Sequence, residues 1–336
     1  EARDNSSEYV ETRSIAFWLG IFLSLSVSFF LLIYIYYDNS YTNGEKISFY
    51  LFLIPIVILQ YVLNYQKINM RGLGKIKLLS KQEVLFSLLL LVLNVIGAYF
   101  FEINGLLLST VITYAITVWY FRNHNVIDSI VFNTTKGLDL LKKGMPLLGV
   151  GLLAVVMGSI GQIMVANKLD LASVGYLSLG LLIGSIVYTI PTALAGVLNP
   201  RYLREYGKYS DPSKISMIFM KYLKTVSIIS PIFIGLIMII VDFIIFYFLN
   251  KYEPAIEVMQ ILLIGMSFQS LSLIFGDPLI AINKQKLIIY AQLISIVLLV
   301  SGMFILLEYE YGLKGVALTI MSVNFIYCLM LATIFI

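Results

Sequence analysis

The sequence predicts an all-α polytopic membrane protein with about ten transmembrane helices in two bundles. Hydrophobic residues make up 60% of the 336-residue chain and charged residues only 12%. Ten apolar segments approach the roughly 20 residues that a helix needs to cross a bilayer. Lys and Arg gather in every second loop between these segments. Water-soluble domains carry about 25% charged residues, so that class of protein is excluded.

The ten segments are expected to be helices because backbone polar groups in hydrocarbon must bond within one segment. Their apolar runs lack the alternating period of membrane β-barrels. Aromatic clusters at several segment ends, such as Tyr99-Phe100-Phe101 and Trp119-Tyr120-Phe121, fit the belts found at membrane interfaces. In chain order the segments are 15–37, 47–66, 84–101, 105–121, 145–167, 174–198, 226–249, 255–282, 287–307 and 312–336.

The cations fix an orientation for these spans. One set of loops holds 19 of the 23 Lys and Arg residues, and the other set holds only Lys46, Lys168, Lys251 and Lys314. Short loops rich in Lys and Arg stay in the cytoplasm. We therefore expect a multi-pass protein of an inner (cytoplasmic) membrane, with Glu1 and Ile336 on the cytoplasmic side.

The longest polar stretch, residues 122–144, divides the spans into four and six. We expect an incomplete N-terminal helical lobe at residues 1–128, a cytoplasmic linker at 129–143 and a six-helix lobe at 144–336. The chain opens without a methionine and ends inside an apolar run. These ends predict a fragment of a longer protein. Two further helices before Glu1 would give that protein two lobes of six helices each.

Several functional classes are disfavoured by what the chain contains. Cys328 is the only cysteine and His124 the only histidine, which argues against an internal disulfide, a His-based metal site and a Ser/His hydrolase site. The net charge of +4 lies in membrane-flanking loops, so it does not indicate nucleic-acid binding. We expect no catalytic residue, no metal and no cofactor.

Small residues and prolines mark places where helices approach closely or bend. Gly158 and Gly161 lie near one face of the fifth segment, and Gly180-x-x-x-Gly184 follows in the next. Such faces serve static packing or a sliding seam. Pro191 and Pro231 interrupt two spans and act either as hinges or as passive kinks.

Asp242 and Asp277 are acidic residues that lie away from the ends of apolar segments. Asp242 is about 10 Å inside the outer end of its span, at 1.5 Å per residue. A carboxylate there usually faces a cavity or a partner, so Asp242 is a candidate coupling-ion or proton site; the alternatives are a neutral carboxyl group and contact with interfacial water. Asp277, which precedes Pro278, is interpreted as a local turn or cap.

Polar amides within the spans suggest a pathway for a hydroxyl-rich cargo, because amides both donate and accept hydrogen bonds; each can also serve only helix packing. They are Gln60, Asn64, Asn94, Gln162, Asn167, Gln260, Gln269, Gln292 and Asn324. The basic loop that follows Asn64 holds Lys67 and Arg71, which can clamp phosphate oxygens or signal topology.

Several short motifs of the chain form a recognisable set. They are Leu140-Leu141-Lys142-Lys143-Gly144-Met145-Pro146, Gly161-Gln162-Ile163-Met164-Val165, Val174-Gly175-Tyr176, Asn199-Pro200-Arg201-Tyr202-Leu203 and Arg71-Gly72-Leu73-Gly74-Lys75. They resemble motifs of the polysaccharide flippases of bacteria, the O-antigen and capsule oligosaccharide transporters of the multidrug/oligosaccharidyl-lipid/polysaccharide (MOP) exporter superfamily, and the first run resembles the start of their C-terminal lobe. Many relatives carry an acidic residue where this chain has Gly161, so no acidic role is transferred there.

The resemblance implies a fragment of a twelve-helix MOP-type fold and a lipid-linked oligosaccharide cargo, usually on undecaprenyl pyrophosphate. The implied partners are this cargo, membrane lipids and other proteins of O-antigen, lipopolysaccharide or capsule assembly. We expect Asn64, Lys67, Arg71, Gln162 and Asn167 to contact the substrate. Two alternatives stay open: a multidrug or organic-cation exporter of the same superfamily, and a membrane-embedded glycan polymerase or glycosyltransferase.

Overall fold

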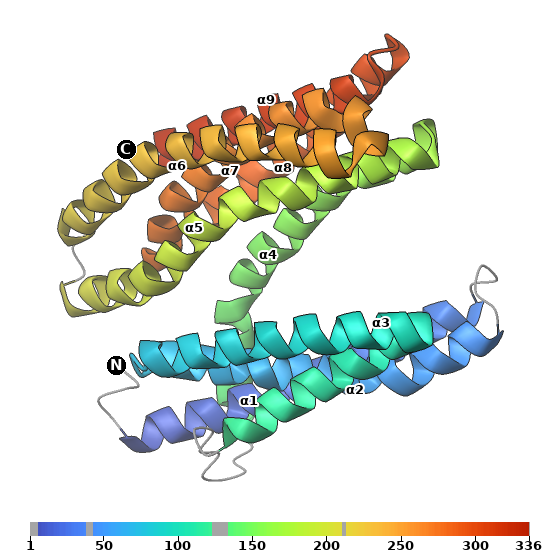
Figure 1. Ribbon diagram of the computed structural model, residues 1–336. Coiled ribbons are helices and arrows are strands. Elements are labelled where there is room, and N and C mark those ends of the chain that lie inside the picture. Colours follow the sequence, from blue (N-terminus) through green and yellow to red (C-terminus); the bar gives the residue numbers. More distant parts are fainter. Residues whose placement is uncertain (1–5, 38–42, 123–133, 210–212, 336) are drawn as a thin grey trace. The chain divides into compact units, whose positions relative to one another are not determined.

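The fold is all-helical in the computed structural model, which describes residues 6–37, 43–122, 134–209 and 213–335 (Figure 1). Nine helices within these ranges are long and apolar enough to cross a membrane, which confirms the predicted fold class. The helices are α1 (Ser6–Tyr37), α2 (Asn43–Gly72), α3 (Ile76–Tyr120), α4 (Thr134–Lys168), α5 (Leu171–Tyr209), α6 (Ser213–Phe248), α7 (Ile256–Ala281), α8 (Gln285–Glu308) and α9 (Gly312–Phe335), with a short 3₁₀ helix, η2 (Asn250–Ala255), before α7.

Helix α3 contains two of the predicted spans. Its 45 residues would extend about 68 Å as a straight helix, more than twice the roughly 30 Å of a bilayer core. Glu102 breaks it with φ 51° and ψ −130°, and the Ser109 hydroxyl beyond the break donates to Asn94 Oδ1 at 2.5 Å before it. The two halves therefore lie antiparallel, and the turn falls in the short loop predicted at residues 102–104.

Glu102 holds a backbone conformation that favours glycine. Its angles are close to those of the first central position of a type II′ turn. Replacing Glu102 with glycine is expected to raise the free energy of unfolding by about 1 kcal/mol, because glycine has no Cβ to strain there. Thermal unfolding of the purified protein measures this. Ile103→Gly is the control, since Ile103 is not among the positive-φ residues; equal effects of both changes would contradict the turn geometry.

The chain divides into two compact units, Glu1–Leu141 and Lys142–Ile336. In the first unit, α2 packs against α1 and α3. Tyr61 and Tyr65 of α2 donate hydrogen bonds to the backbone oxygens of Phe17 at 3.2 Å and Arg13 at 3.0 Å in α1. Large apolar side chains such as Phe22 and Phe30 remain exposed, as expected for surfaces that contact lipid.

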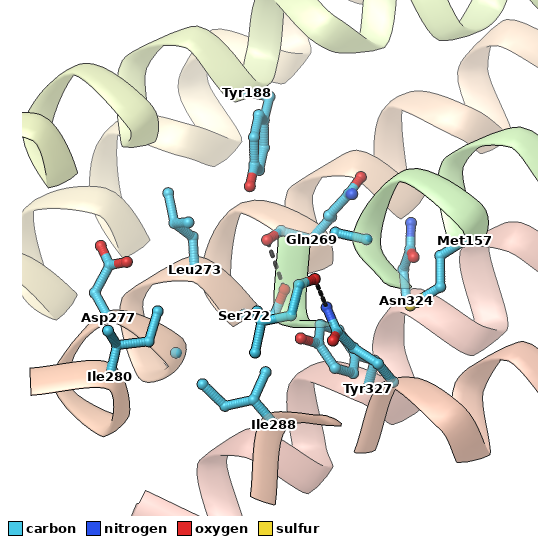
Figure 2. A pocket seen from close by; sticks show the side chains of 14 residues that line it. Met157, Tyr188, Gln269, Ser272, Leu273, Asp277, Ile280, Ile288, Asn324 and Tyr327 are labelled. Carbon is cyan, nitrogen blue, oxygen red and sulfur yellow. Dashed lines mark hydrogen bonds between the residues drawn. The ribbon is translucent and has the colours of Figure 1, made fainter. Parts of the chain in front are cut away.

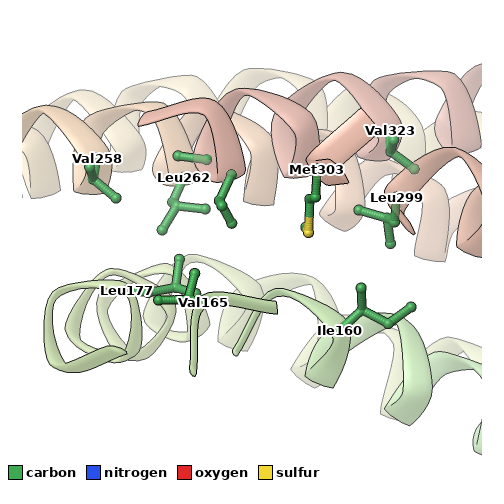
Figure 3. Close-up of a cluster of buried hydrophobic side chains, with 10 residues drawn as sticks. Ile160, Val165, Leu177, Val258, Leu262, Leu299, Met303 and Val323 are labelled. Atoms are coloured by element: carbon green, nitrogen blue, oxygen red, sulfur yellow. The ribbon is translucent and has the colours of Figure 1, made fainter. Parts of the chain in front are cut away.

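Helix α7 is the centre of the second unit, where it packs against α5, α6 and α9 (Figure 1). Gly180 and Gly184 allow the close approach of α5: a Cβ at each would lie 2.7 Å from Leu262 and Met266 of α7, respectively. A cluster of buried apolar side chains joins α4, α5, α7, α8 and α9, including Ile160, Leu177 and Met303 (Figure 3). The predicted Gly180-x-x-x-Gly184 face thus serves helix packing.

The predicted hinge or packing residues occupy different environments. A Cβ on Gly161 would lie 3.1 Å from Ile320 Cδ1 of α9, whereas one on Gly158 would have no neighbour within 4 Å. Pro191 is buried in α5 and its carbonyl oxygen accepts a hydrogen bond from the Tyr222 hydroxyl at 2.8 Å. Pro231 is exposed within α6.

The segment predicted as a linker is helical where the structure describes it. Residues 134–143 form the first turns of α4, and residues 129–133 lie outside the described ranges. The boundary between the units falls at Leu141. Glu1 and Ile336, on which the predicted orientation bears, also lie outside the described residues.

Candidate functional site

One exposed face of α2 carries a row of polar side chains. Gln60, Asn64, Lys67 and Arg71 are spaced by four, three and four residues, so they align along the helix. Gln60, Asn64 and Arg71 are exposed within the first unit. We call these four residues the α2 polar row.

The α2 polar row runs from the end of the span into its middle. Gln60 lies about 18 Å from Gly72, where α2 ends, at 1.5 Å per residue. An exposed amide at this depth must find water or a polar partner, because hydrocarbon offers no hydrogen bonds. This face of α2 therefore suits a hydrated surface better than a lipid-facing one.

The two cations of the α2 polar row, Lys67 and Arg71, differ in the contacts of their side chains. Lys67 Nζ lies 2.9 Å from Glu83 Oε2 and 5.1 Å from the centre of the Phe86 ring, both on α3. Its side chain is only 15% exposed. Arg71 is exposed and makes no ion pair within the described residues. Of the two, Arg71 has the charge that is more available to an anionic ligand.

The other predicted substrate residues, Gln162 and Asn167, are both exposed on α4. Gln162 Nε2 donates to Ser178 Oγ of α5 at 3.3 Å. Asn167 Nδ2 donates to the backbone oxygen of Ile163 in its own helix at 2.8 Å. Because α4 turns 100° per residue, these two side chains point to different sides of the helix.

Asp242, the predicted coupling candidate, is half-buried in α6 and paired with one amide. Gln260 Nε2 of α7 lies 3.2 Å from Asp242 Oδ1 and 3.1 Å from Oδ2. A donor is therefore already directed at both carboxylate oxygens.

Sequence reasoning missed a cavity inside the second unit whose wall contains several polar side chains. Its volume is about 140 Å³, and Figure 2 shows Asp277, Tyr188 and Gln269 among its walls. Three of the amides predicted to line a pathway, Gln269, Gln292 and Asn324, meet here. The remaining lining residues are Val150, Ala154, Met157, Ser272, Leu273, Gly276, Ile280, Ile288 and Tyr327.

Asp277 is the only acidic residue in the wall of this cavity. It is 7% exposed, and its Oδ2 atom has no hydrogen-bond partner. The interpretation of Asp277 as a turn or cap is wrong, because it lies inside α7 with its side chain at the cavity. The signal was present in the spacing: Gln269, Leu273 and Asp277 follow one another at intervals of four, so the amide and the carboxylate lie on one face of the helix.

Gln292 of α8 provides a second unsatisfied oxygen. Its Nε2 atom donates to the backbone oxygen of Val150 in α4 at 3.1 Å, while its Oε1 atom has no partner. The side chain is 3% exposed. Within the described residues, no three His, Cys, Asp or Glu side chains lie close enough to hold a metal ion together.

Comparisons with known proteins place these features in context. A family model described as "Polysaccharide biosynthesis protein" matches residues 2–257. No curated protein matches the sequence.

Solved structures resemble the chain over nearly its whole length. One is an outward-facing multidrug resistance MATE family transporter of the MOP superfamily, with 16% identity, a TM-score of 0.81 and coverage of 98% of this chain and 77% of that one. An inward-facing one gives 14% identity, a TM-score of 0.77 and coverage of 98% and 80%. A MATE in complex with MaD3S gives 16% identity, a TM-score of 0.82 and coverage of 98% and 78%. At these identities the likeness shows the fold.

Proposed function

We propose, from the premise that this chain belongs to the polysaccharide biosynthesis protein family, that it is a flippase for a lipid-linked oligosaccharide. The cargo would be a repeat unit on undecaprenyl pyrophosphate, moved from the cytoplasmic to the outer leaflet for O-antigen, capsule or exopolysaccharide synthesis. The observation that carries this proposal beyond the family is the α2 polar row, a line of amides and cations along one face of an apolar span.

In the proposed mechanism, cationic side chains bind the pyrophosphate of the cargo and amide side chains bind its sugars. A pyrophosphate needs compensating cations, because uncompensated charge within a bilayer costs several kcal/mol. Arg71, with Lys67 beside it, would receive the pyrophosphate at the cytoplasmic mouth. Gln60 and Asn64 would exchange hydrogen bonds with sugar hydroxyls further along the α2 polar row. Gln162 and Asn167 are proposed sugar contacts in the second unit.

Transport would follow alternating access, in which two lobes built of repeated helices rock about a cavity near the midplane. The proposed lobes are residues 1–128 and 144–336, with Glu1 and Ile336 in the cytoplasm of a bacterium. The partition of 19 cations against 4 supports this orientation. No bond is made or broken in this proposal, so it requires no catalytic residue.

A multidrug or organic-cation exporter is a second candidate, favoured by one observation. Asp242 is half-buried within α6 and Asp277 is buried within α7, and buried carboxylates suit a cationic substrate. An exporter would lower the accumulation of cationic dyes in cells, whereas a flippase would leave it unchanged.

Deleting the full-length gene in its native host tests the proposed function. The expected result is loss of surface polysaccharide with accumulation of lipid-linked repeat units on the cytoplasmic side of the membrane, restored by a plasmid copy. Unchanged surface polysaccharide without such accumulation would reject the flippase proposal.

A further inference from the structure

The first unit holds an open pocket between the two halves of α3. Its volume is about 300 Å³, and it is lined by Leu78, Lys81, Leu85, Tyr120 and Phe121. The first three residues follow one another at intervals of three and four, so they share one face of the first half of α3. Tyr120 and Phe121 come from the end of the second half. One cation, one phenol and three apolar side chains therefore meet at this pocket.

The polar and apolar parts of the pocket are ordered along the helix axis. Lys81 precedes the predicted span that begins at residue 84, and Tyr120 lies at the end of the span predicted at 105–121. Leu85 lies four residues, or about 6 Å, further into its span than Lys81. Exposed apolar side chains continue on the same two faces of α3: Leu88 and Val92 after Leu85, and Ile116 and Ile112 before Tyr120. A cation at the end of two spans, followed by an apolar surface, matches the arrangement of a phospholipid.

The charge of the pocket favours an anionic head group. Lys81 is exposed and makes no ion pair within the described residues. No Asp or Glu is among the described lining residues, and Glu83, two residues further on, accepts a hydrogen bond from Lys67 at 2.9 Å. Arg122 adds positive charge at the same end of α3, where its guanidinium carbon lies 5.1 Å from the centre of the Trp119 ring. A phosphate would pair with the Lys81 ammonium group, whereas the amine of a zwitterionic head group would find no carboxylate.

The size and the phenol of the pocket fit a phosphate with a glycerol attached. At roughly 30 Å³ per water molecule, the volume of about 300 Å³ equals that of about ten waters. The Tyr120 hydroxyl can donate to and accept from glycerol hydroxyls, and tyrosine commonly lies at the level of lipid head groups. Basic pockets between membrane helices bind anionic head groups in other proteins.

We infer that the pocket lined by Lys81 and Tyr120 binds one anionic phospholipid of the phosphatidylglycerol type. Its phosphate lies at Lys81, its glycerol head group at Tyr120, and an acyl chain along the exposed apolar faces of α3. This lipid is a bound component of the protein and is distinct from the cargo proposed above. The inference therefore does not rest on the flippase function.

Native mass spectrometry of the purified protein, titrated with phosphatidylglycerol or with phosphatidylcholine, tests this inference. The wild type is expected to bind one phosphatidylglycerol at least about tenfold more tightly than phosphatidylcholine. Lys81→Gln is expected to lower the affinity for phosphatidylglycerol about tenfold, because the cation that lines the pocket is lost. Lys81→Arg keeps the charge and should keep the wild-type affinity.

Lys286→Gln is the matched control, because Lys286 is an exposed cation at the start of α8 that does not line the pocket. Its affinity for phosphatidylglycerol should equal that of the wild type. Leu78→Trp keeps every charge but fills the pocket, so it should also weaken binding, and it decides the question if Lys81→Gln does not fold. Equal losses in Lys81→Gln and Lys286→Gln would overturn the inference, since the lipid would then respond to surface charge in general. Equal affinities of the wild type for the two lipids would overturn it too.

The same titration with undecaprenyl-pyrophosphate oligosaccharide separates the two classes of phosphate lipid. Its affinity should be unchanged in Lys81→Gln. If this variant loses affinity for the oligosaccharide lipid but not for phosphatidylglycerol, the pocket receives cargo and the inference is wrong. A protein that binds phosphatidylglycerol at Lys81 but does not translocate the oligosaccharide would keep the inference and lose the flippase proposal.

Discussion

Replacing Gly105 with alanine is expected to lower the free energy of unfolding by about 3 kcal/mol. A Cβ at Gly105 would overlap the carbonyl oxygen of Gly97, and one at Gly97 would lie 2.5 Å from the carbonyl oxygen of Gly105. Both obstacles are backbone atoms, so no side chain can rotate away. The two halves of α3 would have to separate, and the expected result is a lower Tm and less protein in the monodisperse peak of size-exclusion chromatography.

Gly151→Ala is the matched control for this prediction. Gly151 also lies in a helix, but a Cβ there would have no neighbour within 4 Å. Alanine at that position is expected to stabilise the protein by up to about 1 kcal/mol, because glycine is the weaker helix former. If both variants had the Tm of the wild type, the close antiparallel contact within α3 would be wrong.

Replacing Arg71 with alanine is expected to lower the rate of lipid-linked oligosaccharide translocation at least about tenfold. Hydrogen bonds to charged groups contribute about 1.5 to 3 kcal/mol, and each 1.4 kcal/mol is a factor of ten. Arg71 ends the α2 polar row and makes no ion pair within the described residues. Its guanidinium group can bind two phosphate oxygens at once.

Lys77→Ala separates this role from topology signalling. Lys77 is an exposed cation of the same basic segment, but it lies on α3 and outside the α2 polar row. Both variants remove one positive charge from the same basic segment, so in both the protein should keep the wild-type orientation in the membrane. The prediction fails if Lys77→Ala slows translocation as much as Arg71→Ala does.

Hydropathy predicted where the helices lie in the sequence better than where they end. The segment expected at 174–198 is part of α5, which continues to Tyr209, and the segment at 226–249 is part of α6, which begins at Ser213. The additional residues contain Lys, Arg and Glu, which are good helix formers in water. An apolar segment ends where polar residues begin, whereas the hydrogen bonds of the helix continue into those polar residues.

The candidate site was predictable where one helix carries it. The spacing of Gln60, Asn64, Lys67 and Arg71 is visible in the sequence of α2 alone, and the structure adds that Gln60, Asn64 and Arg71 are exposed within the first unit. The cavity of the second unit could not be predicted from the sequence, because its walls come from five helices: α4, α5, α7, α8 and α9. Only packing shows that Asp277 and Gln292, which are distant in sequence, both lie buried at one cavity.

Translocation by the purified protein tests the central claim most directly. Proteoliposomes would carry undecaprenyl-pyrophosphate oligosaccharide, and a membrane-impermeant glycosidase would report how fast inner-leaflet oligosaccharide reaches the outside. The expected result is translocation that depends on the protein and is slowed by Arg71→Ala but not by Lys77→Ala. A rate equal to that of protein-free vesicles, with the protein folded and inserted, would contradict the account.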